Sequence, residues 1–148
     1  MQGILMGNLA LFMKKNKKVR QNAFYPATKT LLDEKGHPLM WEIKPLTTEE
    51  TEKIRLECTR EVPVPGKKNM FRDKVNSNLY LDKMMVAAIV FPDLYNAELQ
   101  DSYGVKTPEE LLKKMIDDPS EYSDLMSFIQ EQSGFDKDIQ DEVEEAKN

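Results

Sequence analysis

The sequence predicts an α+β, mainly helical fold in which a short N-terminal helix and a β-hairpin are followed by a compact bundle of four to six helices. Strand-forming side chains flank a single turn in residues 23–46, and the later part of the chain repeats helix-start signals ahead of apolar stripes. A length of 148 residues is typical of one domain with one core. We therefore expect residues 1–22 to form a flexible segment with a short helix, residues 23–134 a single globular domain, and residues 135–148 an acidic helix or tail.

The composition limits the class of partner and the compartment. Apolar residues make up 40% of the chain and charged residues 32%, which is ordinary for a folded protein. The formal net charge of −5 disfavours general attraction to nucleic acid or to anionic membranes. The one cysteine, Cys58, has no partner for an internal disulfide, so we expect the cytoplasm and not an oxidising compartment.

The apolar residues 1–13 predict a short amphipathic helix. The run is too short to span a bilayer, and its basic residues follow it, whereas those of a signal peptide come first. Lysines and one arginine then make residues 14–20 a basic, strongly hydrated stretch. We expect no membrane partner for this segment.

Residues 23–46 predict a β-hairpin around a turn at residues 33–36. In its second strand Trp41 and Ile43 share one face, and their charged neighbours share the other. Proline donates no hydrogen bond to a ladder, so Pro26 places its strand at an edge or delays its start.

A capping box begins the next element. Thr47 and Glu50 have the T-x-x-E spacing in which each residue satisfies the other's backbone N–H, and this predicts a helix running to about Arg60. Residues 62–75 contain two prolines, a glycine and four basic residues, which predicts an exposed loop.

The remaining chain predicts further helices with clear ends. Residues 79–91 are so uniformly apolar that they predict a central core helix. A short helix or turn and two longer amphipathic helices follow it. The signals are Asn76 or Asn78 and Pro92 for the core helix, Gly104 for the short element, Thr107–Pro108 for the first long helix, and Asp118–Pro119 with Gly134 for the second.

Residue types that usually carry catalysis are scattered. His37 is the only histidine, and it lies in a turn with no second histidine to hold a metal. Cys58 has no suitably placed base, so a buried structural role is expected. The glycines are all isolated, which disfavours a phosphate-binding loop. The sequence thus predicts no catalytic residue, no metal site and no cofactor, and the protein is not expected to be an enzyme.

Three segments together resemble a known family. They are WEIKPLT at Trp41–Thr47, FPDL at Phe91–Leu94 and AELQDSYG at Ala97–Gly104. From about Leu9 to its last residue, the chain is similar to the XkdN-like tail assembly chaperones of long-tailed phages and of defective prophages in Gram-positive bacteria. Such composite signatures are far more specific than one short motif.

The resemblance implies a protein of the bacterial cytoplasm that is needed while a phage tail is built and is absent from the finished particle. It implies the tape measure protein as partner, with the tail tube protein as a second candidate. A tape measure protein is long, helical and apolar, so a soluble acidic partner is suited to shield its apolar stripe before tube subunits cover it. The alternative is a structural tail component that is retained in the virion.

The family supplies no binding residues to carry over, so candidates come from this sequence. Tyr95, Leu99 and Tyr103 have helical spacing in a polar stretch, where they either anchor a partner helix or simply cover the end of the core helix. Met70 and Phe71, in the basic loop, are either a second exposed contact or ordinary loop residues.

The last three residues, 146–148, suggest a further product of the gene. Ala-Lys-Asn can be encoded as GCA AAA AAC, which contains a heptamer on which ribosomes can slip back by one base. Tail chaperone genes often use such a slip, so we hypothesise that a frameshifted longer form of the chain is a further partner.

Overall fold

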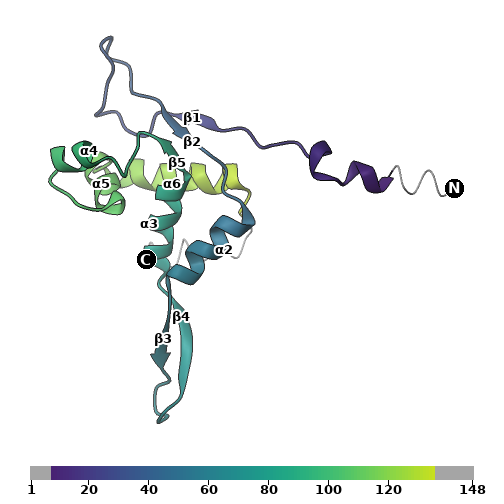
Figure 1. Cartoon of the computed structure of the whole chain (residues 1–148). Helices are drawn as coiled ribbons and strands as arrows, with labels where there is room; N and C mark the ends of the chain where they lie inside the picture. The colour runs from purple at the N-terminus through teal and green to yellow at the C-terminus, as the bar shows by residue number, and fades with distance from the viewer. Residues whose placement is uncertain (1–7, 136–148) are drawn as a thin grey trace.

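The structure, a computed structural model, describes residues 8–135 and has the α+β, mainly helical fold that the sequence predicts (Figure 1). Residues 8–11 are helical. The later helices are η1 (Lys14–Asn16, a 3-10 turn), α2 (Thr48–Glu57), α3 (Ser77–Ala88), α4 (Ala97–Ser102), α5 (Pro108–Met115) and α6 (Pro119–Ser133). The strands are β1 (Ala23–Tyr25), β2 (Trp41–Ile43), β3 (Thr59–Pro63), β4 (Phe71–Val75) and β5 (Ile89–Phe91). The acidic tail beyond residue 135 and the heptamer residues 146–148 lie outside the described residues.

β1 and β2 form the predicted hairpin. They pair antiparallel, with Tyr25 opposite Trp41, and the Asp33 carboxylate closes the turn between them by accepting two backbone hydrogen bonds. Trp41 and Ile43 share the buried face as predicted, at 1% and 0% exposed. β1 is an edge strand and ends one residue before Pro26, as the missing proline donor requires.

A third strand completes this sheet and corrects one expectation. The core helix predicted over residues 79–91 is wrong at its end, because α3 stops at Ala88 and the next three residues form β5, which pairs antiparallel with β2. Ile89, Val90 and Phe91 are all good strand formers. A residue that precedes a proline, as Phe91 does, also disfavours the helical conformation.

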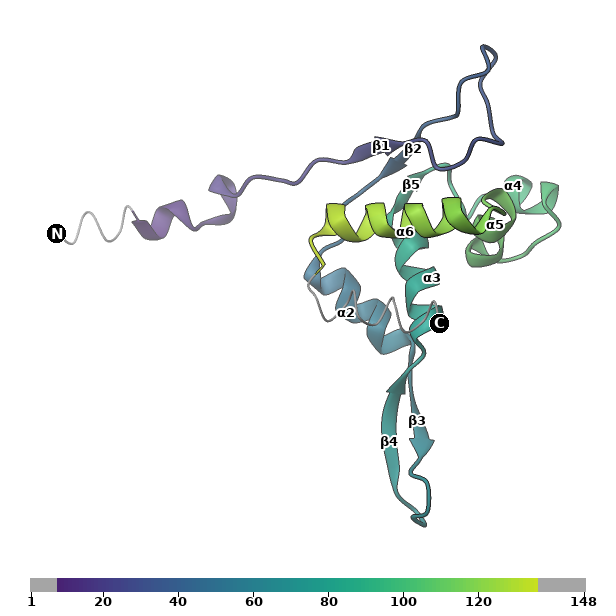
Figure 2. The same ribbon diagram turned by 180° about the vertical axis from the view of Figure 1, so that it is seen from behind.

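The loop predicted over residues 62–75 is also wrong, because most of it belongs to a second hairpin. β3 and β4 pair antiparallel in five residue pairs, from Thr59 opposite Val75 to Pro63 opposite Phe71. Pro63 is the last residue of its strand, so its missing N–H interrupts no further pairing within β3. This hairpin projects from the helices in both views (Figures 1 and 2).

The new hairpin shortens the preceding helix. α2 ends at Glu57 and not near Arg60, because Thr59 already begins β3. The tip of the hairpin takes left-handed backbone conformations at Gly66, with φ of 74°, and at Asn69, with φ of 58°. Glycine and asparagine are the residues that adopt such conformations most readily.

α3 is the central helix of the core and packs against α2, α5 and α6. Met84 and Met85 are completely buried on it, so they are core residues. A smaller cluster of Ile54, Cys58 and Tyr80 joins α2 to α3. Cys58 is therefore buried as expected, and burial raises the pKa of its thiol. His37 lies in the turn of the first hairpin with its side chain 73% exposed.

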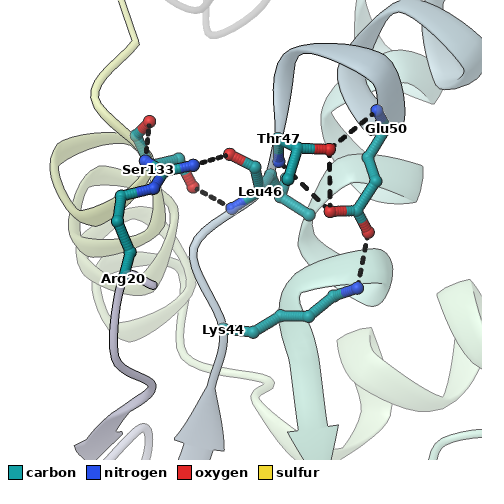
Figure 3. A network of polar contacts seen from close by, with 6 residues as sticks. All are labelled: Arg20, Lys44, Leu46, Thr47, Glu50 and Ser133. Atoms are coloured by element: carbon teal, nitrogen blue, oxygen red, sulfur yellow. Dashed lines mark hydrogen bonds and ion pairs between the residues drawn. The ribbon is translucent and has the colours of Figure 1, made fainter. Parts of the chain in front are cut away.

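A polar joint fastens the N-terminal segment to the body (Figure 3). The Arg20 guanidinium donates hydrogen bonds to the carbonyl oxygens of Ser133, at 2.8 Å, and of Leu46, at 2.6 Å. The Ser133 hydroxyl accepts a third hydrogen bond, at 2.9 Å, from the Leu46 N–H. Since Ser133 is the last residue of α6, the guanidinium also meets the partial negative charge at that helix end. The joint fixes where the chain before β1 leaves the body.

The predicted capping box of α2 is present and is linked to Lys44 (Figure 3). The Thr47 hydroxyl accepts a hydrogen bond from the Glu50 N–H at 3.2 Å, and the Glu50 carboxylate accepts one from the Thr47 N–H at 3.1 Å. The other carboxylate oxygen of Glu50 pairs with the Lys44 ammonium. Burial alone would raise the pKa of Glu50, but the hydrogen bonds from Lys44 and Thr47 outweigh it and lower that pKa.

Replacement of Glu50 by glutamine is expected to lower the free energy of unfolding by about 1 kcal/mol at neutral pH, because it removes the ion pair and weakens the cap. The folded-state pKa of Glu50 lies below its ordinary value of 4.5, so the stabilisation is complete above that pH and is lost as the pH falls through the lowered pKa. Urea denaturation at neutral pH and at about pH 3 measures both limits.

We expect wild type and Glu50→Gln to differ at neutral pH and to converge in acid. Glu49→Gln is the matched control, since Glu49 is exposed in the same helical turn and should lose less. Equal stability of wild type and Glu50→Gln at neutral pH would contradict the role given to the Lys44 pair.

Candidate protein-binding surface

The tip of the β3–β4 hairpin presents Met70 and Phe71 to solvent, at 50% and 60% exposed. Among the described residues, β3 and β4 pair only with each other, so each strand has one open edge. A two-stranded hairpin is marginally stable without further support. The open edges and the apolar tip make it suited to add to, or insert against, another protein chain.

The hairpin is basic although the chain as a whole is acidic. Residues 59–75 contain five basic and two acidic side chains, a formal charge of +3, compared with −5 for the whole chain. The basic residues are Arg60, Lys67, Lys68, Arg72 and Lys74. Complementary charge favours a partner segment in which acidic residues flank an apolar contact.

Tyr95, Leu99 and Tyr103 do not form one exposed stripe. α4 begins at Ala97, where the Asn96 side chain caps it by accepting a hydrogen bond from the Leu99 N–H at 2.9 Å. Tyr95 therefore precedes the helix, and it is 70% exposed. Leu99 and Tyr103 are partly buried against the core, which favours the covering role for these two. The structure separates α4 from the hairpin tip, on different sides of the body (Figures 1 and 2).

An apolar patch that the sequence did not predict lies on the open face of the three-stranded sheet. Phe24 and Phe91 both lie opposite Glu42, one on each neighbouring strand, and both are 63% exposed. Asn22 donates a hydrogen bond to the Glu42 carboxylate at 2.8 Å. The alternation of buried and open positions in β2 indicated an outer face, but only the pairing with β5 places Phe91 on it.

A shallow hollow of about 360 Å³ lies between α5 and α6, and its lining includes Ile116, Tyr122 and Met126. The Tyr122 hydroxyl is already engaged, because it donates a hydrogen bond to the Asp82 carboxylate at 2.7 Å. Within residues 8–135, no three histidine, cysteine, aspartate or glutamate side chains come together in a way that would hold a metal ion. No helix of that part of the chain is long and apolar enough to cross a membrane.

Comparison with protein families decides the class of protein. A model of the phage XkdN-like tail assembly chaperone proteins matches residues 9–147. The chain belongs to this family. The resemblance of the sequence is thereby confirmed, and so is an expected role in phage tail assembly with protein partners.

Two curated relatives match this tail assembly chaperone over nearly its whole length. The XkdN protein of the phage-like element PBSX of Bacillus subtilis (strain 168) is 26% identical over 141 residues, which cover 95% of this chain and 94% of the relative. The uncharacterised protein YqbN of the same strain is also 26% identical over 141 residues, covering 95% of this chain and 93% of YqbN. The crystal structure of YqbN shares the fold, with a TM-score of 0.70 and 20% identity over 86% of this chain and 96% of that one.

The segments that carry the resemblance belong mainly to the scaffold of the chaperone. Trp41, Ile43 and Leu46 in the first segment are fully buried, and so is Leu94 in the second. The third segment forms α4 and its C-terminal turn. The exposed hairpin tip lies outside all three segments, whereas the candidate residues Leu99 and Tyr103 belong to the third.

Proposed function

We propose that this chaperone binds the tape measure protein of its phage or prophage without catalysis and keeps it soluble while the tail is assembled, and that the β3–β4 hairpin is its contact. The observation that supports the proposal most is the hairpin, which projects from the body with Met70 and Phe71 exposed at its tip. A long apolar helical partner needs a cover that adapts to its surface, and the unbranched thioether of methionine adapts well. An aromatic ring beside it adds a large contact area.

The charge of the hairpin supports contact with a protein partner that carries an acidic segment. Its +3 formal charge lies on a chain of −5, so the hairpin differs in sign from the surface behind it. An acidic segment of a partner is then attracted to the hairpin and repelled by the body, which orients the encounter. The tail tube protein is a second candidate for the same contact.

Serine replacement of both Met70 and Phe71 is expected to weaken capture of the tape measure protein by about tenfold or more, since truncation of a hot-spot side chain near the centre of an interface costs about 2 kcal/mol or more in binding. The chain carries an affinity tag and is co-expressed with the tape measure protein, and the captured amount is measured at several salt concentrations. A parallel capture with the tail tube protein tests the second candidate.

Leu56→Ser is the matched control for this experiment, because Leu56 is a 74% exposed residue of α2, away from the hairpin tip. Circular dichroism and thermal unfolding confirm that each variant keeps its fold. Equal capture by the hairpin variant and the control would exclude the hairpin as the contact and direct mutagenesis to Tyr95. Failure of the wild type to capture the tape measure protein would contradict the proposed function itself.

A further inference from the structure

The N-terminal arm, defined here as residues 8–22, carries large apolar side chains that the body does not cover. Leu9, Leu11, Phe12 and Met13 are between 51% and 85% exposed. The arm extends away from the helices in both views (Figures 1 and 2). Exposed apolar groups that adjoin one another in this way mark an interaction site more often than a solvated surface.

The charge of the arm is opposite to that of the rest of the chain. The arm contains five basic residues and no acidic one, whereas residues 23–148 contain 16 basic and 26 acidic residues and carry a formal charge of −10. Two such chains repel each other body to body and attract each other arm to body. A second copy of the same protein therefore offers the arm a surface of complementary charge.

The open face of the sheet offers the arm a matching surface. Phe24 and Phe91 flank Glu42 across three adjacent strands, and they leave an apolar patch with one carboxylate at its centre. Phe12 and the other apolar side chains of the arm can pack on the two rings. Docking of the helix there would bring the lysines that follow directly, beginning with Lys14, towards the Glu42 carboxylate.

The root of the arm disfavours docking on its own body. Arg20 donates hydrogen bonds to two carbonyl oxygens, and Asn22 donates one to the Glu42 carboxylate in the neighbouring strand. A return of the arm to its own sheet would have to reverse the chain between the apolar helix and Arg20, and the residues nearest Arg20, at 17–19, are Lys-Lys-Val and contain none of the usual turn formers. The two adjacent lysines would also repel each other in a tight turn.

We propose that the N-terminal arm of one copy docks its apolar helix on the open sheet face of a second copy. Reciprocal exchange gives a closed two-fold dimer in which both arms and both patches are covered. The inference is independent of the proposed contact with the tape measure protein, since it uses neither the β3–β4 hairpin nor any other partner.

The test is sedimentation velocity of the full chain at several concentrations, with two double variants. The arm variant is Leu9→Ser with Phe12→Ser, and the face variant is Phe24→Ser with Phe91→Ser. All four residues are at least 63% exposed, so the fold should survive. We expect a wild-type dimer, self-association at least about tenfold weaker in each variant, and an unchanged dimer for the control Leu56→Ser.

Mixing the two variants provides the decisive result. The face variant keeps an intact arm and the arm variant keeps an intact face, so the mixture should recover one of the two contacts and form a heterodimer that neither variant forms alone. A mixture that stays monomeric would overturn the pairing of arm with face. A wild-type monomer at every concentration would overturn the proposal, and reduced capture of the tape measure protein by the arm variant would then assign the arm to that partner.

Discussion

Trp41→Ala is expected to lower the free energy of unfolding by about 3–5 kcal/mol, the usual cost of truncating a large buried aromatic residue. Trp41 lies on β2, the central strand of the three-stranded sheet, with its side chain 1% exposed in the main core. Truncation of the side chain leaves a cavity that the surrounding core residues fill only in part. A loss of this size is a substantial fraction of the stability of a typical domain, which is about 5–15 kcal/mol.

Urea denaturation followed by circular dichroism measures this loss, because Trp41 is the only tryptophan and its fluorescence disappears with it. Trp41→Phe fills most of the volume and should lose less. Leu39→Ala, two residues before it and 43% exposed, should change stability by less than about 0.5 kcal/mol. A Trp41→Ala variant as stable as Leu39→Ala would contradict the burial of Trp41 in the main core.

Asp82→Ala is expected to cost about 2–3 kcal/mol, because hydrogen bonds to a charged group each contribute about 1.5–3 kcal/mol and one of the two here is discounted for exposure. The Asp82 carboxylate, 16% exposed, accepts hydrogen bonds from the Tyr122 hydroxyl at 2.7 Å and from the Lys113 ammonium at 2.8 Å. These bonds join α3 to α6 and α5. Urea denaturation of Asp82→Ala beside the exposed control Asp101→Ala measures the difference.

Because of the hydrogen bond between Tyr122 and Asp82, we also expect a loss of stability in alkali. Burial and the hydrogen bond to Asp82 raise the pKa of the Tyr122 phenol above its ordinary value of 10.0. The protonated phenol is therefore favoured in the folded state, and its stabilisation is complete below that pH and is lost as the pH rises above it. Tyr122→Phe should remove this part of the alkaline slope. An identical slope in wild type and variant would contradict the buried hydrogen bond.

Local signals allowed the helix starts to be predicted from sequence. The Thr47 and Glu50 box, the Thr107 cap with its following proline, and the Asp118 cap each involve residues within one helical turn, so no distant contact is needed to form them. Gly134 ends α6 in the left-handed conformation, with φ of 75°, which glycine adopts without strain. Helix boundaries set by such caps were confirmed.

Strands that depend on distant partners were not predictable in the same way. Ile89–Phe91 form β5 because β2, more than 40 residues earlier, supplies the ladder, and the apolar run that leads into them is equally compatible with a buried helix. The prolines at positions 63 and 65 indicated a loop, because a hairpin tolerates proline only at strand ends and in the turn. Local composition therefore did not distinguish an exposed loop from this hairpin.

The candidate contact residues were also only partly predictable from local sequence. The exposure of Phe71 and Tyr95 agrees with their polar or basic surroundings in sequence. Leu99 and Tyr103 have the spacing of an exposed stripe, yet they pack partly against the core, and their spacing alone does not show which side of α4 the core covers. Phe24 and Phe91 were not predicted to form a patch, because only the assembled sheet brings them to opposite sides of Glu42.

The most direct test of the proposed function is the solubility of the tape measure protein, expressed with and without this chain in the same cells. We expect the tape measure protein to be largely insoluble alone, and to move to the soluble fraction and co-purify with the chaperone when both are made. Equal insolubility in both cases, with the chain recovered instead as a component of mature particles by mass spectrometry, would contradict the proposed function.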